Sequence, residues 1–470
     1  MSDSIHNHTP PQNSSPKSMP PPTTNWRNVI FIIIAAAVSF GAYFLLPYDT
    51  NVNKGLAILL FIGFLWLTEA VHITVTALLI PVLAVVFQIP DMNTKTALSN
   101  FADPVIYVFF GGFALASALH VQQLDRKIAL KVIALSRGNL FSAILLIFAV
   151  TAFLSMWISN TATAAMMLPL SMGLLSHLNP EKDRNTFTFV LLGIAYCASL
   201  GGIGTLVGSP PNAIAAKALG VDFTGWMKLS LPIALVLLPA MLLSLYVVLR
   251  PNLHTTVSLE TETIPWTLSR VLTVCVAVAT ALAWIFSSYI AKATGITSID
   301  SIIALIAAAM VVILGTVSWR DVAKNTDLGV LLLFGGGITL SVLMSKSGAS
   351  SALGNEVAQI LSGASPLVII VAVATFIILL TNFTSNTASA ALFVPMFATI
   401  ATQMGLPEQV LVLIIGIGAS CAFMLPVGTP PNALVFATGQ IRQKDMVNVG
   451  FVLSVLSIAI LSAWAWLFLM

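Results

Sequence analysis

Four short polar patches interrupt an otherwise apolar chain, and they form two matched pairs. The sequence Ser-Asn-Thr-Ala-Thr at residues 159–163 returns 226 residues later as Ser-Asn-Thr-Ala-Ser at residues 385–389. Each copy precedes a second motif, Gly-Ser-Pro-Pro-Asn at 208–212 and Gly-Thr-Pro-Pro-Asn at 428–432, which are 220 residues apart. In a membrane, irregular polar backbone is tolerated only where protein buries it or where it lines a cavity. Paired interruptions in two halves of a chain therefore predict a solute-binding site.

The residue types in these patches suit anions on one side and small cations on the other. Ser, Asn and Thr are favoured N-cap residues, and the first helical turn leaves N–H groups without intrahelical partners. Those N–H groups and the positive end of the helix dipole attract an anion. Ser209-Pro210 and Thr429-Pro430 repeat the pattern, with a hydroxyl residue as cap and Pro at the first helical position. The carbonyl and hydroxyl oxygens opposite each helix start are hard ligands suited to Na⁺.

None of the four patches contains Lys or Arg. A divalent anion bound there would need another source of positive charge, and two bound sodium ions would supply it. A single Ser-Asn-Thr copy is also compatible with a plain helix cap or an interhelical hydrogen-bond cluster. Two copies in matched repeats, each with a Pro-Pro-Asn break downstream, favour the binding site.

The composition predicts an all-α polytopic membrane protein. Hydrophobic residues make up 58% of the chain and charged residues only 8%, with a mean hydropathy of +0.98. Many runs approach the roughly 20 apolar residues that cross a bilayer. Their continuous rather than alternating pattern argues against a β-barrel. The basic residues are scattered through short loops, so nucleic-acid binding has no support.

Basic loops set the predicted topology, because Lys and Arg favour the cytoplasmic side. The segment 139–178 has a basic loop on each side, which predicts a re-entrant hairpin that enters and leaves at the cytoplasmic face. The segment 366–404 is flanked by almost no Lys or Arg, which predicts a second hairpin entering from outside. Residues 124–137 form a basic amphipathic segment, either a helix in the cytoplasmic interface or a continuation of the helix before it.

The predicted organisation is eleven transmembrane helices plus two re-entrant hairpins in inverted repeats, with the N-terminus cytoplasmic and the C-terminus external. Its parts are a disordered tail (1–25), a first span (26–54), repeat 1 (55–250), a linker (251–265) and repeat 2 (266–470).

At these residues the chain resembles the divalent anion:sodium symporter (DASS) family, and in particular its bacterial INDY-type dicarboxylate carriers. The resemblance covers nearly the whole chain beyond the tail. It rests on the two Ser-Asn-Thr motifs, on YCASLGGIGTLVGSPPN at residues 196–212 and on CAFMLPVGTPPN at residues 421–432. It implies an elevator-type homodimer with a scaffold domain and a transport domain, the latter holding both hairpins and both broken helices.

The resemblance also implies the ligands and their residues. One sodium site would use Ser155, Ser159, Asn160 and Gly208, and the other Thr381, Thr384, Asn386 and Gly428. The substrate carboxylates would meet Asn160, Thr161, Ser209, Asn386, Thr387, Thr429 and Pro430. The implied substrates are C4-dicarboxylates such as succinate, malate and fumarate, while some relatives carry citrate or sulfate.

The sequence therefore predicts a sodium-coupled dicarboxylate symporter of the inner (plasma) membrane. A sodium-independent dicarboxylate exchanger and an anion channel are the alternatives. An enzyme is not expected, because the polar patches lack acid, base and nucleophile groups.

Overall fold

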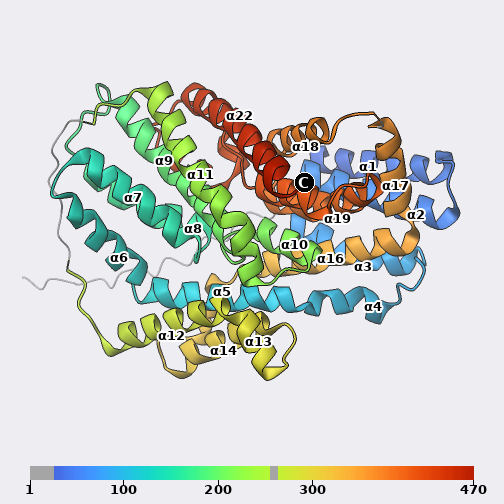
Figure 1. Ribbon diagram of the computed structural model, residues 1–470, viewed down its shortest axis with the longest axis horizontal. Coiled ribbons are helices and arrows are strands. Elements are labelled where there is room, and N and C mark those ends of the chain that lie inside the picture. The colour runs from blue at the N-terminus through green and yellow to red at the C-terminus, as the bar shows by residue number, and fades with distance from the viewer. Residues whose placement is uncertain (1–25, 254–262, 362) are drawn as a thin grey trace, which may run out of the picture.

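The computed structural model describes residues 26–253, 263–361 and 363–470, and the regular elements in these ranges are helices (Figure 1). The predicted tail (1–25) and residues 254–262 of the predicted linker lie outside the described residues. The first half contains α1 (Trp26–Leu45), α2 (Thr50–Thr68), α3 (Ile73–Val86), α4 (Thr94–Ser99), η1 (Asn100–Ala102), α5 (Pro104–Val121), α6 (Leu124–Ile133), η2 (Ala134–Ser136), α7 (Leu140–Ser155), α8 (Asn160–Leu175), α9 (Arg184–Gly201), η3 (Gly202–Gly204), α10 (Pro210–Leu219) and α11 (Phe223–Leu249).

The second half follows a similar order. It contains α12 (Leu268–Ile285), α13 (Ser287–Thr294), α14 (Ile299–Ile313), α15 (Trp319–Asn325), α16 (Leu328–Ser347), α17 (Ala349–Ile360), α18 (Pro366–Leu380), α19 (Asn386–Gln403), α20 (Glu408–Gly418), η4 (Pro426–Gly428), α21 (Pro430–Phe436) and α22 (Gln443–Phe468).

Many of these helices can cross a bilayer. Within the described residues, 8 helices are long and apolar enough, and α13 with α14, which meet at an angle of 103°, would make 9. This confirms the all-α polytopic membrane protein. The other two predicted spans fall on α3, of 14 residues, and on the interrupted pair α20 and α21. The count of eleven spans thus stays a prediction.

The two predicted hairpins coincide with two helix pairs. In the first half, α7 and α8 flank a turn at residues 156–159, and in the second, α18 and α19 flank a turn at residues 381–385. Both second helices carry an internal proline at the same distance from their Ser-Asn-Thr motif, Pro169 in α8 and Pro395 in α19. The repeat therefore extends beyond the motifs. The side of the membrane from which each pair enters stays a prediction.

Glycines allow close contacts between two pairs of helices: a glycine of α5 faces α14, and a glycine of α16 faces α3. A Cβ added to Gly111 would lie 2.4 Å from the carbonyl oxygen of Ala304 in α14. A Cβ added to Gly336 would lie 2.6 Å from Cβ of Ala77 in α3. Small residues let helix backbones approach this closely in membranes. In Figure 1, α12, α13 and α14 gather at one edge of the molecule, against α5.

The basic segment after α5 forms a separate helix. Gln123 has a left-handed backbone conformation (φ 54°) between α5 and α6, so α6 does not continue α5, and that alternative is wrong. Lys127 on α6 donates to the carbonyl oxygen of Ile264, and its ammonium lies 4.2 Å from the ring centroid of Trp266. Helix α6 is thereby attached to the segment that leads into α12.

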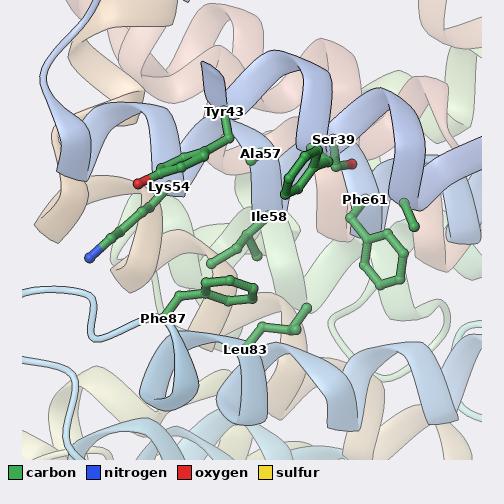
Figure 2. A pocket seen from close by; sticks show the side chains of 10 residues that line it. Ser39, Tyr43, Lys54, Ala57, Ile58, Phe61, Leu83 and Phe87 are labelled. Atoms are coloured by element: carbon green, nitrogen blue, oxygen red, sulfur yellow. The ribbon is translucent and has the colours of Figure 1, made fainter. Parts of the chain in front are cut away.

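An apolar groove of about 430 Å³ runs between α1, α2 and α3 (Figure 2). Tyr43 and Lys54 lie at one end of it and Ser39 and Phe61 at the other. None of the four polar patches contributes to its lining. The groove is thus separate from the predicted binding site.

The contact between α5 and α14 gives a test of the fold. We expect Gly111→Ala to destabilise the protein by about 1–3 kcal/mol, because the new methyl group would overlap Ala304 and force the helices apart. Gly173→Ala is the control, because nothing lies within 4 Å of its added Cβ. Thermal unfolding of the detergent-solubilised protein measures both. Equal melting temperatures for the two variants would contradict the close packing.

Candidate functional site

The first hairpin turn is held against the first broken helix by one buried hydroxyl. Ser155, the last residue of α7, donates to the carbonyl oxygen of Ala198 in α9 over 2.6 Å. Its Oγ also lies 2.7 Å from the side-chain amide of Asn160, the first residue of α8. Ser159 is the N-cap of α8, where its Oγ accepts from the N–H of Ala162 at 3.3 Å. The cap predicted from the Ser-Asn-Thr motif is confirmed here.

The second hairpin turn has the same arrangement. Thr381 Oγ1 lies 2.7 Å from the carbonyl oxygen of Ala419, beyond α20, and 2.7 Å from Oδ1 of Asn386. Ser385 caps α19 by accepting from the N–H of Ala388 at 3.4 Å. Thr384 instead lies 2.7 Å from the hydroxyl of Ser389, within its own hairpin. Each hairpin thus contacts the broken helix of its own repeat through a hydroxyl five residues before the motif asparagine.

The Pro-Pro-Asn motifs hold the unwound part of each broken helix in place. The buried Asn212 Nδ2 lies 2.7 Å from the carbonyl oxygens of both Gly202 and Thr205, to which it donates. Asn432 Nδ2 donates in the same way to Ala422, at 3.0 Å, and to Leu425, at 3.1 Å. These side chains satisfy carbonyl groups that have lost their helical partners. The motifs stand out in the sequence, but this role of their final residue depends on contacts that the sequence does not show.

The two repeats meet at the unwound segments. The hydroxyl of Tyr196 on α9 donates to the carbonyl oxygen of Phe423 over 2.7 Å, and Ser209 Oγ lies 3.4 Å from Ser420 Oγ. A continuous series of contacts therefore runs from the first hairpin turn to the second, through residues 208–209 and 419–420.

One predicted cap is wrong in detail. Thr429 caps α21, because its Oγ1 accepts from the N–H of Asn432 at 3.2 Å. Ser209 occupies the equivalent position ahead of α10, but its side chain makes no cap hydrogen bond. Its hydroxyl faces Ser420 of the other repeat instead. The two halves are thus similar without being identical.

Oxygen atoms cluster around the side chain of Asn160. The Asn160 side-chain NH₂ group donates to the carbonyl oxygen of Ala198 at 3.0 Å and to that of Gly208 at 3.1 Å, and it lies 2.7 Å from Ser155 Oγ. Carbonyl oxygens accept hydrogen bonds and cannot donate them. The Asn160 amide therefore satisfies these acceptors, and a cation that displaced the amide would meet the same hard oxygen ligands.

The backbone is packed more tightly around Gly208 than around its counterpart Gly428. A Cβ added to Gly208 would lie 2.4 Å from the carbonyl oxygen of Gly202 and 2.9 Å from that of Ser155. At Gly428 the nearest atom would be Cβ of Ala422, at 3.2 Å. Only the first glycine is therefore required by close backbone approach.

The remaining predicted residues differ in exposure. Thr161 and Pro430 are exposed, while Ser209, Thr387 and Thr429 are buried. The structure brings Ser155, Asn160 and Gly208 into one cluster, and Thr381 with Asn386 into another. At the start of α8, the N–H of Ala162 donates to the Ser159 hydroxyl and the N–H of Thr163 donates to the Ser159 carbonyl oxygen. The N–H groups of Asn160 and Thr161 come before these first hydrogen bonds of the helix.

Comparisons with known proteins agree with this geometry. The family model described as "Sodium:sulfate symporter transmembrane region" matches residues 23–470. A protein of Haemophilus influenzae named "Uncharacterized transporter" is 52% identical over 94% of this chain and 97% of its own. A Staphylococcus saprophyticus protein named "Sodium-dependent dicarboxylate transporter SdcS" is 33% identical over 88% of this chain and 86% of its own.

A solved structure shares the fold. The Alcanivorax borkumensis YdaH transporter, whose crystal structure is described as having an unusual topology, matches with a TM-score of 0.55. The match covers 84% of this chain and 98% of the other, at 12% sequence identity.

The two motif asparagines give a test of the site's construction. We expect Asn212→Ala to lower the melting temperature strongly, because each buried carbonyl left unpaired costs about 1–3 kcal/mol. Asn432→Ala should have a similar effect, because Asn432 also donates to two carbonyls. Gln359→Ala, at an exposed position of α17, serves as the control. The assigned role is wrong if the asparagine variants melt at the control's temperature.

Proposed function

The chain belongs to the sodium:sulfate symporter (DASS) family of sodium-coupled anion transporters, and on this premise we propose that it carries C4-dicarboxylates such as succinate, malate and fumarate together with sodium. The family model's name mentions sulfate, whereas the staphylococcal relatives are named for dicarboxylates. The more similar Haemophilus protein has no named substrate. The choice of a dicarboxylate therefore depends on the site.

The oxygen cluster at Asn160 carries the proposal. The Ser155 hydroxyl and the carbonyl oxygens of Ala198 and Gly208 converge on the Asn160 side chain, with Ser159 adjacent, and supply oxygen ligands for a first sodium site. Uncharged oxygen ligands suit Na⁺, which prefers them to nitrogen or sulfur. The second sodium site uses Thr381, Thr384, Asn386 and Gly428, where the same hydroxyl-to-asparagine contact of 2.7 Å recurs.

The substrate lies between the two hairpin turns in this proposal. The N–H groups at the starts of α8 and α19 face its carboxylates, because helix N-termini attract anions. The side chains that complete the site are Asn160, Thr161, Ser209, Asn386, Thr387, Thr429 and Pro430. Since these positions contain no Lys or Arg, the sodium ions balance the charge of the dianion. Substrate affinity then depends on sodium, which couples the two fluxes.

The wider proposal covers topology and movement. The chain would act as a homodimer in the inner membrane, with its N-terminus in the cytoplasm, eleven spans and two oppositely entering hairpins. A transport domain containing both hairpins and both broken helices would move against a scaffold domain, in an elevator mechanism.

Uptake into proteoliposomes tests the function. We expect labelled succinate to accumulate when sodium is imposed outside, and to enter much more slowly without sodium, because the dianion is then unneutralised. Uptake that requires internal dicarboxylate but no sodium would indicate an exchanger, and conductive uptake without accumulation would indicate a channel. Asn160→Ala and Asn386→Ala should both abolish accumulation in protein that still elutes as the wild type does. Wild-type uptake by either variant would remove the site assignment.

The unequal packing around the two glycines makes a finer prediction. We expect Gly208→Ala to reduce sodium-driven uptake at least about tenfold, because the methyl group would clash with the Gly202 and Ser155 carbonyls and displace the Gly208 backbone from the cluster. Gly428→Ala should keep most of the activity, since its added Cβ meets nothing closer than the methyl group of Ala422, at 3.2 Å, which can shift slightly. Uptake against sodium concentration measures both. Equal losses in the two variants would contradict the asymmetry.

A further inference from the structure

A polar pocket of about 330 Å³ is lined by none of the motif residues of the candidate site. Three separate segments form it: residues 181–186 ahead of and at the start of α9, Arg250 and Asn252 after α11, and Arg442 before α22. The helices that carry these segments pack together, α9 with α11 and α11 with α22. Four of the nine lining residues are cationic, namely Lys182, Arg184, Arg250 and Arg442, against two acidic ones.

The cations in this pocket differ in how they are paired. Arg442 forms a two-point ion pair with Asp445, at 2.7 and 3.2 Å. Within the described part of the chain, Lys182, Arg184 and Arg250 have no ion pair. The Nε–H of Arg184 is buried and has no acceptor there. Because a buried donor without an acceptor is destabilising, this guanidinium is placed as if to receive an oxygen ligand.

The two acidic residues of the pocket, Asp183 and Glu181, do not form ion pairs with these cations within the described residues. Asp183 Oδ2 accepts from the N–H of Asn179 at 3.2 Å, within its own loop. Glu181 is exposed. Formal charges on the lining residues therefore give an excess of positive charge, and the N-terminus of α9 adds its dipole in the same direction.

Hydrogen bonds hold two of the three segments that form this pocket in fixed positions. Thr186 Oγ1 lies 3.1 Å from both the N–H and the carbonyl oxygen of Asn252, so the start of α9 is joined to the chain after α11. Arg250 has a left-handed backbone (φ 47°) that ends α11. A general preference for basic cytoplasmic loops explains positive charge, but not its convergence from three segments around a half-buried arginine whose Nε–H has no acceptor.

We propose that this pocket binds a phosphate group, held by Arg184, Arg250 and Lys182. Arginine's planar fork matches two phosphate oxygens at once, and a neighbouring lysine adds a third donor. The phosphate belongs either to a soluble anion or to the headgroup of an anionic phospholipid. This site is separate from the substrate site, and its existence does not depend on the transport function proposed above.

Binding there would join three helices of the region that contains the candidate site. Helix α9 is the first half of one broken helix, and α22 follows the second half of the other. Arg250 begins the segment that connects α11 to α12. A ligand in the pocket therefore stabilises the relative positions of α9, α11 and α22.

Thermal unfolding and calorimetry of the purified full-length protein test the proposal. For the soluble source, pyrophosphate is titrated into delipidated protein at constant ionic strength, with chloride as the comparison. For the lipid source, the protein is placed in phosphatidylcholine nanodiscs with or without phosphatidylglycerol. We expect one of these to raise the melting temperature, and the responding arm identifies the source.

Variants locate the response. Arg184→Gln combined with Arg250→Gln should weaken binding at least about tenfold, because it removes two charge-assisted contacts. Arg184→Lys with Arg250→Lys keeps the charge and should bind more strongly than the Gln pair. Arg320→Gln, which removes an exposed charge from α15, and Asn160→Ala in the substrate site should both keep the response. No stabilisation of the wild type in either arm, or equal stabilisation of the wild type and the Gln pair, would overturn the proposal.

Discussion

The fold depends on satisfying backbone carbonyl groups where two helices are interrupted inside a membrane protein. A helix that stops in an apolar environment exposes groups that water cannot reach, and each must find a partner within the protein. Asn212 and Asn432 provide it by donating to carbonyls of the unwound segments 202–205 and 422–425. With those carbonyl groups hydrogen-bonded, the irregular backbone can remain inside the membrane-embedded part of the protein. The oxygens and helix starts of the candidate site exist only because these segments stay unwound.

The same solution is used twice, and the copies support each other. Each hairpin turn contacts its own broken helix through Ser155 or Thr381, while contacts at Tyr196 and Ser209 join the two broken helices. Such a shared centre keeps the two hairpin turns at a fixed separation. The copies have nevertheless diverged, since Gly208 is packed against carbonyl oxygens and Gly428 against a methyl group. The two cation sites proposed here would therefore differ in affinity.

Much of this arrangement could be predicted from the sequence, because the signals were local. The hairpin segments 139–178 and 366–404 end within a few residues of the helix pairs, since polar N-caps mark where a helix begins. Other features depend on contacts between distant residues. The hydroxyl of Ser209 faces Ser420 rather than its own helix, and nothing near residue 209 indicates that. The bend of 103° between α13 and α14 was also missed, because α13, of only 8 residues, is too short to stand out from the apolar run before it.

Charge connects this architecture to the proposed coupling. An anion surrounded by protein needs compensating charge, and a fixed lysine or arginine would hold it in the absence of any second solute. Neutral hydroxyl, amide and carbonyl groups cannot do this alone, so affinity falls when mobile cations are absent. The carbonyl oxygens of Ala198 and Gly208 and the hydroxyl of Ser155 converge on the Asn160 side chain, and these are hard ligands suited to such a cation. A cation bound among them would raise the local potential for an anion at the start of α8. Each solute then stabilises the binding of the other, and this reciprocity is what symport requires.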